Sequence, residues 1–264
     1  MKTSTRKFAL LLAFLLLAGV AEAQSILSGK GTSMPAYIGE LATNVGTGYG
    51  QYRSVRTEAL DVVQPTVVGT VYLTDDWSSG ELFITLNRML EAESFKYDIE
   101  NNQFLINTTN SPSPTPDQLR VINSTAVDAF KLADPILGDR VFVNATHAGL
   151  TINGQPATGF VEVLVNDEGI SLFRKVDTEL IRASYNVAFN AGDKNDRIVR
   201  REDYYLKKGN QKELLEITGK KKQNLSYFSE QQPAMTAFLK KNDIDFNSAP
   251  DLVKLVSYYN SLSK

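Results

Sequence analysis

Between residues 66 and 218 the chain is built from short β-type segments joined by turns, and no long helical pattern separates them. Three pairs of segments flank a polar turn: "ESFKYD" and "QFLIN" around "DIENN", "TGFVEVLV" and "ISLFRK" around "NDEG", and "REDYYL" and "ELLEIT" around "KKGNQ". Apolar runs on both sides of such turns predict β-hairpins. Since parallel strands need long crossovers, we expect a mainly β fold, either an antiparallel hairpin-built sheet or a barrel-like β domain.

The last part of the chain, residues 219–264, changes to helical periodicity. In "LSYFSEQQPAMTAFLKKN" the apolar residues recur at helix-like spacing, and Pro233 suits the start of a new helix. "SAPDLVKLVSYYNSL" begins with a Ser-x-x-Asp capping box. Its apolar stripe comprises Leu252, Leu255, Val256 and Tyr259. We therefore expect a short C-terminal helical segment whose stripe packs on the β region as core, in preference to binding a partner.

The N-terminus predicts export. Basic residues precede the apolar run "FALLLAFLLLAGVA", and Ala21-Glu22-Ala23 is a small-x-small cleavage site. Residues 1–23 are therefore predicted as a signal peptide, with the mature chain starting at Gln24. A membrane anchor is the alternative, but the apolar run is shorter than the ~20 residues of a span. We expect a soluble protein without a transmembrane segment, in the periplasm or outside the cell.

The chain contains no cysteine. A bacterial lipoprotein is attached to lipid through a cysteine at the cleavage point, so this chain is not expected to be one. Disulfides are also excluded, although an exported protein would meet conditions that permit them. The fold must therefore be stabilised by an ordinary apolar core.

Two segments have little pattern. Residues 24–65 are weakly patterned, and the glycines of "NVGTGYGQY" precede no helix pattern, which argues against a phosphate-binding loop. Residues 107–117, "NTTNSPSPTPD", hold three prolines at alternate positions and cannot lie inside a strand. A loop of this length is either functional or merely flexible, and we favour flexible.

Charge indicates no nucleic-acid partner. The formal net charge is −2, with acidic residues in excess before residue 174 and basic residues in excess after it. This distribution predicts either two surfaces of opposite sign or, as we favour, a Lys-rich helical end. The basic residues alternate with acidic ones and form no known nucleic-acid motif.

Several enzyme classes lack their residues. His147 is the only histidine and there is no cysteine, so a zinc centre and a thiol nucleophile are not expected. The Gly-x-Ser-x-Gly pattern is absent, and "DKND" lacks the glycine and glutamate of a calcium loop. We expect no metal and no cofactor, and we interpret His147 as a polar residue at a strand edge.

The stretch "TVYLTDDWSSGELFITL" holds the only tryptophan and the candidate site residues Asp75, Asp76, Trp77 and Glu81. As a ligand surface, it offers an aromatic platform and carboxylates for a glycan hydrolase. Neighbouring Asp75 and Asp76 point to opposite sides of an extended chain, so a further carboxylate would be needed. We favour a turn that reverses the chain between "TVYL" and "ELFITL", with Gly80 at positive φ and Trp77 in the core.

Several segments in order carry a resemblance: "GTVYLTDDWSSGEL", "FKYDIENNQFLI", "FVEVLVNDEGISLFRK", "YYL", "AFLKKN" and "DLVKLVSYYNSL". Over about residues 66–262 the chain resembles a group of uncharacterised exported proteins of Bacteroidota-type bacteria. The group has no established activity, so it assigns no catalytic residue. The resemblance implies a bacterial cell-envelope context, and residues 107–117 depart from its pattern.

Two functions remain open from sequence. The first is a non-enzymatic binding or structural protein of the cell envelope, with an envelope protein or a surface polymer as its partner. The second is a carboxylate-dependent hydrolase acting on envelope or environmental glycans. We favour the first, because no convergent set of catalytic residues is recognisable in the sequence.

Overall fold

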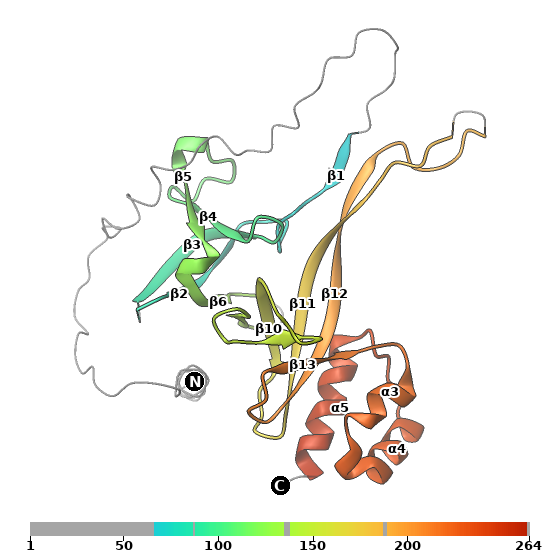
Figure 1. The fold of residues 1–264 in the computed structure, drawn as a ribbon. Coiled ribbons are helices and arrows are strands. Elements are labelled where there is room, and N and C mark those ends of the chain that lie inside the picture. The colour runs from blue at the N-terminus through green and yellow to red at the C-terminus, as the bar shows by residue number, and fades with distance from the viewer. Residues whose placement is uncertain (1–65, 87, 135–137, 187–188, 263–264) are drawn as a thin grey trace.

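The computed structural model describes residues 66–262 except 87, 135–137 and 187–188. It confirms the expected fold class: a large, mostly antiparallel sheet carries a short helical segment at its C-terminal end (Figure 1). The predicted signal peptide and the weakly patterned segment 24–65 lie outside the described residues.

Thirteen strands and three α-helices are described. The strands are β1 (Val67–Gly69), β2 (Ser78–Ile84), β3 (Arg88–Asp98), β4 (Gln103–Asn107), β5 (Leu119–Asn123), β6 (Val127–Leu132), β7 (Arg140–Asn144), β8 (Thr151–Ile152), β9 (Gln155–Pro156), β10 (Phe160–Val165), β11 (Ile170–Ile181), β12 (Asp196–Lys208) and β13 (Glu213–Ile217). The helices are α3 (Lys221–Ser226), α4 (Gln232–Lys241) and α5 (Ala249–Leu262).

The strand order is β5-β4-β3-β2-β6-β7-β10-β11-β12-β13-β8-β9, and β1 pairs separately with β12. The three predicted hairpins are confirmed as β3–β4, β10–β11 and β12–β13. Strands β5, β6 and β7 were not predicted, because their apolar residues alternate with charged and amide side chains over only five or six positions. The segment 107–117 connects β4 to β5 and is organised by Asn107, which donates to the Ser111 carbonyl at 2.7 Å.

One face of the sheet carries two apolar cores separated by ion pairs. A cross-strand row on this face comprises Leu90, Leu82, Phe130, Phe142, Glu162, Arg174, Tyr204 and Ile217. Phe130 and Phe142 belong to a phenylalanine-rich core under β2–β7. Tyr204 and Ile217 belong to the core that β11–β13 share with the helices. The opposite face holds a third core, which residues 145–157 cover.

The helical end packs as the sequence predicted. Leu252, Leu255, Val256 and Tyr259 are all buried in the core shared with β11–β13. The same helix, α5, presents the buried Asn260, which the sequence did not single out. Its amide accepts a hydrogen bond from Ile170 N at 3.0 Å and donates one to Ile170 O at 2.8 Å, so it ties α5 to the start of β11.

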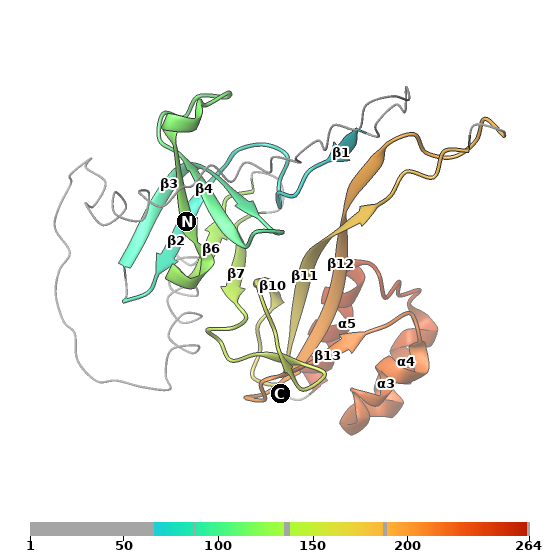
Figure 2. The ribbon, with the colours of Figure 1, turned by 45° about the horizontal axis from the view of Figure 1, so that its top comes forward.

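The sheet closes on itself through the segment that follows β1. Val71 O accepts from Ile99 N at 3.0 Å and Leu73 N donates to Tyr97 O at 2.9 Å, which places residues 71–73 beside β3. Because β1 pairs in parallel with β12, hydrogen bonds run in a circuit through β3, β2, β6, β7, β10, β11, β12 and residues 67–73. The distal half of the β11–β12 hairpin, residues 176–186 and 189–201, projects as an arm, and β1 pairs with the β12 strand of this arm (Figures 1 and 2).

The predicted reversal at "TDDWSSG" is wrong. Tyr72 lies antiparallel to Asp98 and Ser78 lies antiparallel to Phe95, so both segments run in the same direction along β3. Six positions separate Tyr72 from Ser78, whereas three separate their partners, and the extra residues loop outward. The chain continues in the same direction after the loop because residues before it and residues after it both pair with β3.

The predicted role of Gly80 is also wrong, because its φ is not positive. Gly80 is needed for close approach, since a Cβ atom there would lie 1.9 Å from the Lys131 carbonyl oxygen on β6.

Candidate functional site

The sequence-predicted residues Asp75, Asp76 and Trp77 lie on the outward loop before β2. Both aspartates are exposed, and Asp75 forms an ion pair with Arg200 of β12 at 3.0 Å. Trp77 is half-buried and belongs to none of the three cores, so the prediction that it is a core anchor is wrong. The Lys96 ammonium lies 5.2 Å from the centre of its ring, a cation–π contact.

Glu81 does not join these residues in one site. It lies on β2 and pairs with Lys131 of β6 at 2.7 Å. Asp75 and Glu81 are therefore each held by a cation on a different strand. The structure brings Asp75 and Trp77 together around Lys96, whose ammonium donates to the Asp75 carbonyl, but it gives Glu81 separate contacts.

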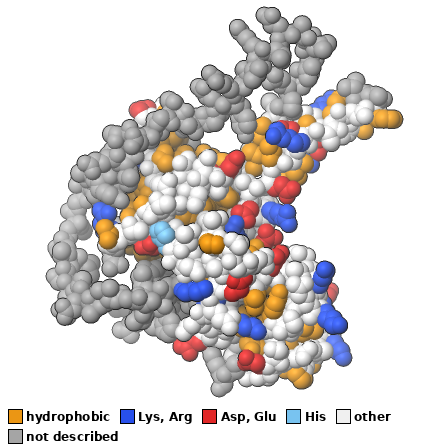
Figure 3. Space-filling view, in the orientation of Figure 1, with side chains coloured by type: hydrophobic (Ala, Val, Ile, Leu, Met, Phe, Trp, Pro, Cys, Tyr) orange, Lys and Arg blue, Asp and Glu red, His pale blue; other side chains and the backbone are white. Residues whose placement is uncertain are grey.

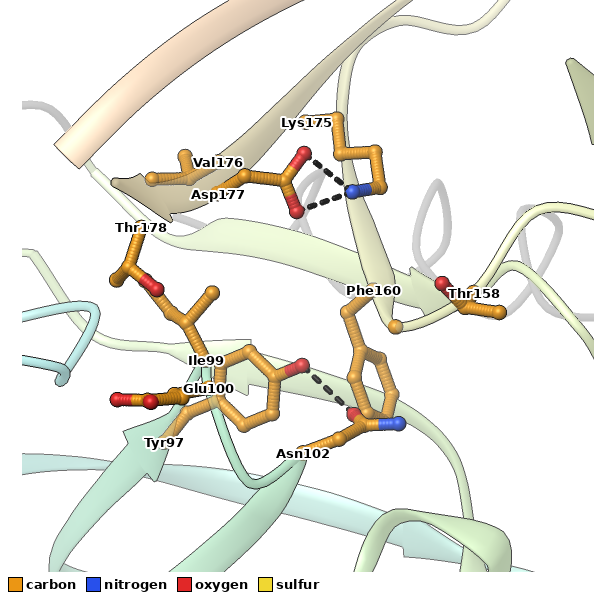
Figure 4. A pocket seen from close by; sticks show the side chains of 11 residues that line it. Tyr97, Ile99, Glu100, Asn102, Thr158, Phe160, Lys175, Val176, Asp177 and Thr178 are labelled. Carbon is orange, nitrogen blue, oxygen red and sulfur yellow. Dashed lines mark hydrogen bonds and ion pairs between the residues drawn. The ribbon is translucent and has the colours of Figure 1, made fainter. Parts of the chain in front are cut away.

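A cavity of about 430 Å³ lies elsewhere, between the β3–β4 turn, the start of β10 and the middle of β11 (Figure 4). Its apolar wall is formed by Tyr97, Ile99, Phe160 and Val176. The rings of Tyr97 and Phe160 meet edge to face, with centroids 5.2 Å apart. Polar groups surround this wall, among them Glu100 and the ion-paired Lys175 and Asp177. Apolar walls with a few polar groups are typical of binding sites.

The Tyr97 hydroxyl is a fixed neutral donor. Burial raises the pKa of Tyr97 well above its ordinary value, so the phenol keeps its proton. It donates to Asn102 Oδ1 at 2.8 Å, across the β3–β4 turn (Figure 4). Asn102 has φ +51°, a left-handed conformation that asparagine tolerates, which lets the turn bring its side chain back to Tyr97. The hydrogen bond therefore holds one wall of the cavity in place.

A second cavity of about 180 Å³ continues the first along the arm. It is lined by Glu100, Thr178, Leu180 and Ile198, and the first two residues line both cavities. Together the two cavities form one groove. β11, from Lys175 to Leu180, lies on one side of it, and the β3–β4 turn lies on the other. We call it the β11 groove.

Buried ion pairs make the strands under this groove rigid. Glu162, with 3 % of its surface exposed, accepts hydrogen bonds from Arg140 Nε at 2.8 Å and from Arg174 Nη2 at 2.6 Å. Arg174 also reaches Glu202 at 3.1 Å. Three strands, β7, β10 and β11, are thus joined through one carboxylate, and the link extends to β12. Charge-assisted bonds of this kind are strong and directional.

Charges along the groove are mostly paired internally. Asp177, which lines the first cavity, pairs with Lys175. Glu100 is exposed and has no ion-pair partner among the described residues. Figure 3 shows acidic and basic side chains intermixed between the arm and the helices, with basic side chains along the outer edge of the helices. The groove therefore retains one unpaired negative charge, that of Glu100.

His147 is a turn residue. Its Nδ1 lies 2.7 Å from Asp128 Oδ1, and its backbone N–H donates to Asn144 Oδ1 at 3.3 Å. Across the described residues, no three His, Cys, Asp or Glu side chains gather where they could hold a metal ion.

Sequence reasoning missed the β11 groove. Tyr97 and Phe160 were recognised only as strand residues, and Glu100 and Asn102 only as part of a turn. The one signal in the local sequence is a turn that ends in Asn102, a residue type that tolerates positive φ, five positions after Tyr97. Nothing in the local sequence shows that this turn faces β11, because the curl of the four strands between β3 and β11 brings them together.

Comparison with protein-family models, with curated proteins and with solved structures finds no match to this chain. None of the helices among the described residues combines the length and the apolar character needed to cross a lipid bilayer.

Proposed function

We propose that this chain is an exported protein of the bacterial cell envelope that binds an envelope protein or a surface polymer and does not catalyse a reaction. The β11 groove is its binding site. The observation that carries the proposal is the groove itself, which joins an aromatic wall to the free carboxylate of Glu100. The predicted signal peptide and the resemblance to exported proteins support the envelope location.

The groove suits binding because its walls are already fixed. Tyr97 is buried against Phe160 and hydrogen-bonded to Asn102, and Lys175 is ion-paired with Asp177. A ligand therefore meets side chains that lose little freedom on binding, which lowers the entropic cost of association.

Site-specific photo-crosslinking tests this function. A photoreactive amino acid replaces Glu100 in the groove or, as control, exposed Gln211 in the β12–β13 turn at the other end of β12. In native cells we expect the Glu100 position to capture a specific protein or polymer and the Gln211 position to capture none. Equal capture from both positions, or none from either, would remove the groove from consideration. N-terminal sequencing of the exported protein should begin at Gln24.

A glycan hydrolase is the second candidate, and one observation favours it: the carboxylates Glu100 and Asp177 line the same cavity. Asp177 is neutralised by Lys175, which suits a structural role better than a catalytic one. Release of reducing sugar ends from envelope polysaccharides, abolished in Glu100→Gln, would support the hydrolase and overturn the binding proposal.

A further inference from the structure

The arm has an unpaired strand edge that faces the β11 groove. β11 pairs with β12 along its whole length, from Ile170 to Ile181. On its other side, β10 covers only Leu172–Lys175. From Val176 to Ile181, no described segment forms backbone hydrogen bonds with this side of β11. Free strand edges readily pair with another extended chain.

The two cavities of the groove follow one another along β11 and share Thr178. Val176, Thr178 and Leu180 alternate along β11 toward the groove, and Thr178 lies where one cavity meets the next. Side chains on one face of a strand repeat every two residues, about 6.6–6.8 Å. A strand paired with this edge would thus place residues i and i+2 over successive cavities.

The lining of the cavities defines the side chains that fit. The first combines an apolar wall of Tyr97, Phe160 and Val176 with polar side chains around it, and the second has an apolar wall of Leu180 and Ile198, so each can take an apolar group against its wall. Leu180 keeps 38 % of its surface exposed, which an apolar partner residue would cover. Glu100 lies between the cavities and favours a basic residue next to the apolar ones.

An edge of alternating N–H and C=O groups matches a polypeptide better than a glycan. Only another backbone in extended conformation presents donors and acceptors at the same repeat. Resting on the proposed function, we infer that the β11 groove binds an extended segment of a partner protein, which pairs with residues 176–181 of β11 as an added strand. That segment carries apolar residues at i and i+2 and a neighbouring basic residue.

The test uses the mature protein and a phage-displayed library of random linear peptides of about eight residues. Selection on the wild-type protein is followed by counter-selection on Thr178→Arg, which fills the groove with a long cationic side chain. We expect enriched peptides to show the i, i+2 apolar pattern and to bind Thr178→Arg at least about tenfold more weakly. Glu179→Gln, on the opposite face of β11, should bind them like wild type, and Glu100→Gln about two- to fivefold more weakly.

Backbone methylation of the enriched peptides tests strand pairing without any change in the protein. Two sets of peptides carry N-methyl groups on alternate residues, one set on the odd positions and the other on the even positions. In one set (one phase) the methyl groups remove the N–H groups that face β11, and in the other they remove the N–H groups that face away from it. We expect one phase to weaken binding about tenfold or more and the other phase to leave it nearly unchanged.

Equal tolerance of both phases would overturn strand addition, as would enrichment that Thr178→Arg does not reduce. Enriched peptides that match residues 24–65, or a concentration-dependent dimer lost in Thr178→Arg, would assign the edge to the chain itself and overturn the partner. If no peptide is enriched while crosslinking at Glu100 captures a polymer, the proposed function stands and this inference fails.

Discussion

The Tyr97 ring meets the Phe160 ring edge to face at 5.2 Å, although β2, β6 and β7 lie between their strands in the sheet. This contact between strands that are not neighbours stabilises the curvature of the sheet. Phe160→Ala should therefore lower the free energy of unfolding by ~3–5 kcal/mol, the usual cost of removing a buried phenylalanine. Urea denaturation measures this loss.

Tyr97→Phe is the matched control for the ring contact between Tyr97 and Phe160. It keeps the ring against Phe160 and removes only the hydrogen bond to Asn102, so it should cost ~0.5–1.5 kcal/mol. If Tyr97→Phe destabilised the protein as much as Phe160→Ala, the hydrogen bond and not the ring contact would hold the curl.

Alkaline pH should destabilise the protein through its buried tyrosines. Burial, with a contribution from Asp203, raises the pKa of Tyr205 from 10.0 to about 12. Between these values the unfolded chain releases a proton that the folded protein retains, so the contribution of Tyr205 is complete below about pH 10 and is lost as pH rises through about 12. Unfolding midpoints at about pH 9 and about pH 11.5 measure the decline.

Tyr205→Phe should decline less over that interval, because phenylalanine has no proton to lose. The same substitution at Tyr185, which is only partly buried, controls for the loss of any tyrosine. A decline in Tyr205→Phe as steep as in wild type would contradict the assignment.

The local parts of this fold could be predicted from sequence. The β3–β4, β10–β11 and β12–β13 hairpins join neighbouring segments, and turn residues with flanking apolar runs are sufficient to place them. The stripe of Leu252, Leu255, Val256 and Tyr259 also followed directly from helical spacing. In each case the residues that specify the element lie within a few positions of one another.

The remainder depends on contacts between distant residues. Residues 71–73 and Ser78 both pair with β3, and the outward loop between them resembles a hairpin turn in composition. Gly80 illustrates the same limit, since its requirement is set by the Lys131 carbonyl fifty-one positions later in the chain. The β11 groove could not be predicted, because its walls come from three separate hairpins.

The buried Asn260 should be essential for docking α5. Asn260→Ala leaves Ile170 N–H and C=O buried without their partners, so we expect the free energy of unfolding to fall by ~2–4 kcal/mol. Ser261→Ala, an exposed change on the same helix, should cost less than ~0.5 kcal/mol. Retained stability in Asn260→Ala, measured by thermal denaturation, would mean that α5 docks through its apolar stripe alone.

Trp77 fluorescence should report the charge of Lys96. Burial lowers the pKa of Lys96 below its ordinary 10.5, against the opposing effect of Asp76 and Asp75. Emission from the single tryptophan should therefore change with pH below 10.5, as the ammonium 5.2 Å from the ring loses its proton. Since the unfolded chain holds this proton to higher pH, the contribution of Lys96 to stability rises across the same interval. Lys96→Met should abolish the fluorescence transition, and a transition that persisted would belong to another group.

Glu162 and Glu81 separate a buried ion pair from a more exposed one. Glu162→Gln leaves Arg140 and Arg174 facing a neutral amide in a site where the native carboxylate is 3 % exposed, so we expect a loss of ~3–5 kcal/mol in the free energy of unfolding. Glu81→Gln breaks a pair with Lys131 that keeps 27 % of the glutamate side chain exposed, and solvent should limit its cost to ~1 kcal/mol or less. Urea denaturation of both variants checks the order. If the two variants lost the same free energy of unfolding, the ion pairs of Glu162 between the two cores would be hydrated. They could then not fix β7, β10 and β11 beneath the β11 groove. Peptide binding would then be measured in Glu162→Gln. If the ion pairs of Glu162 hold the strands rigid, this variant should bind the peptide more weakly than wild type, and if they are hydrated, its affinity should not change.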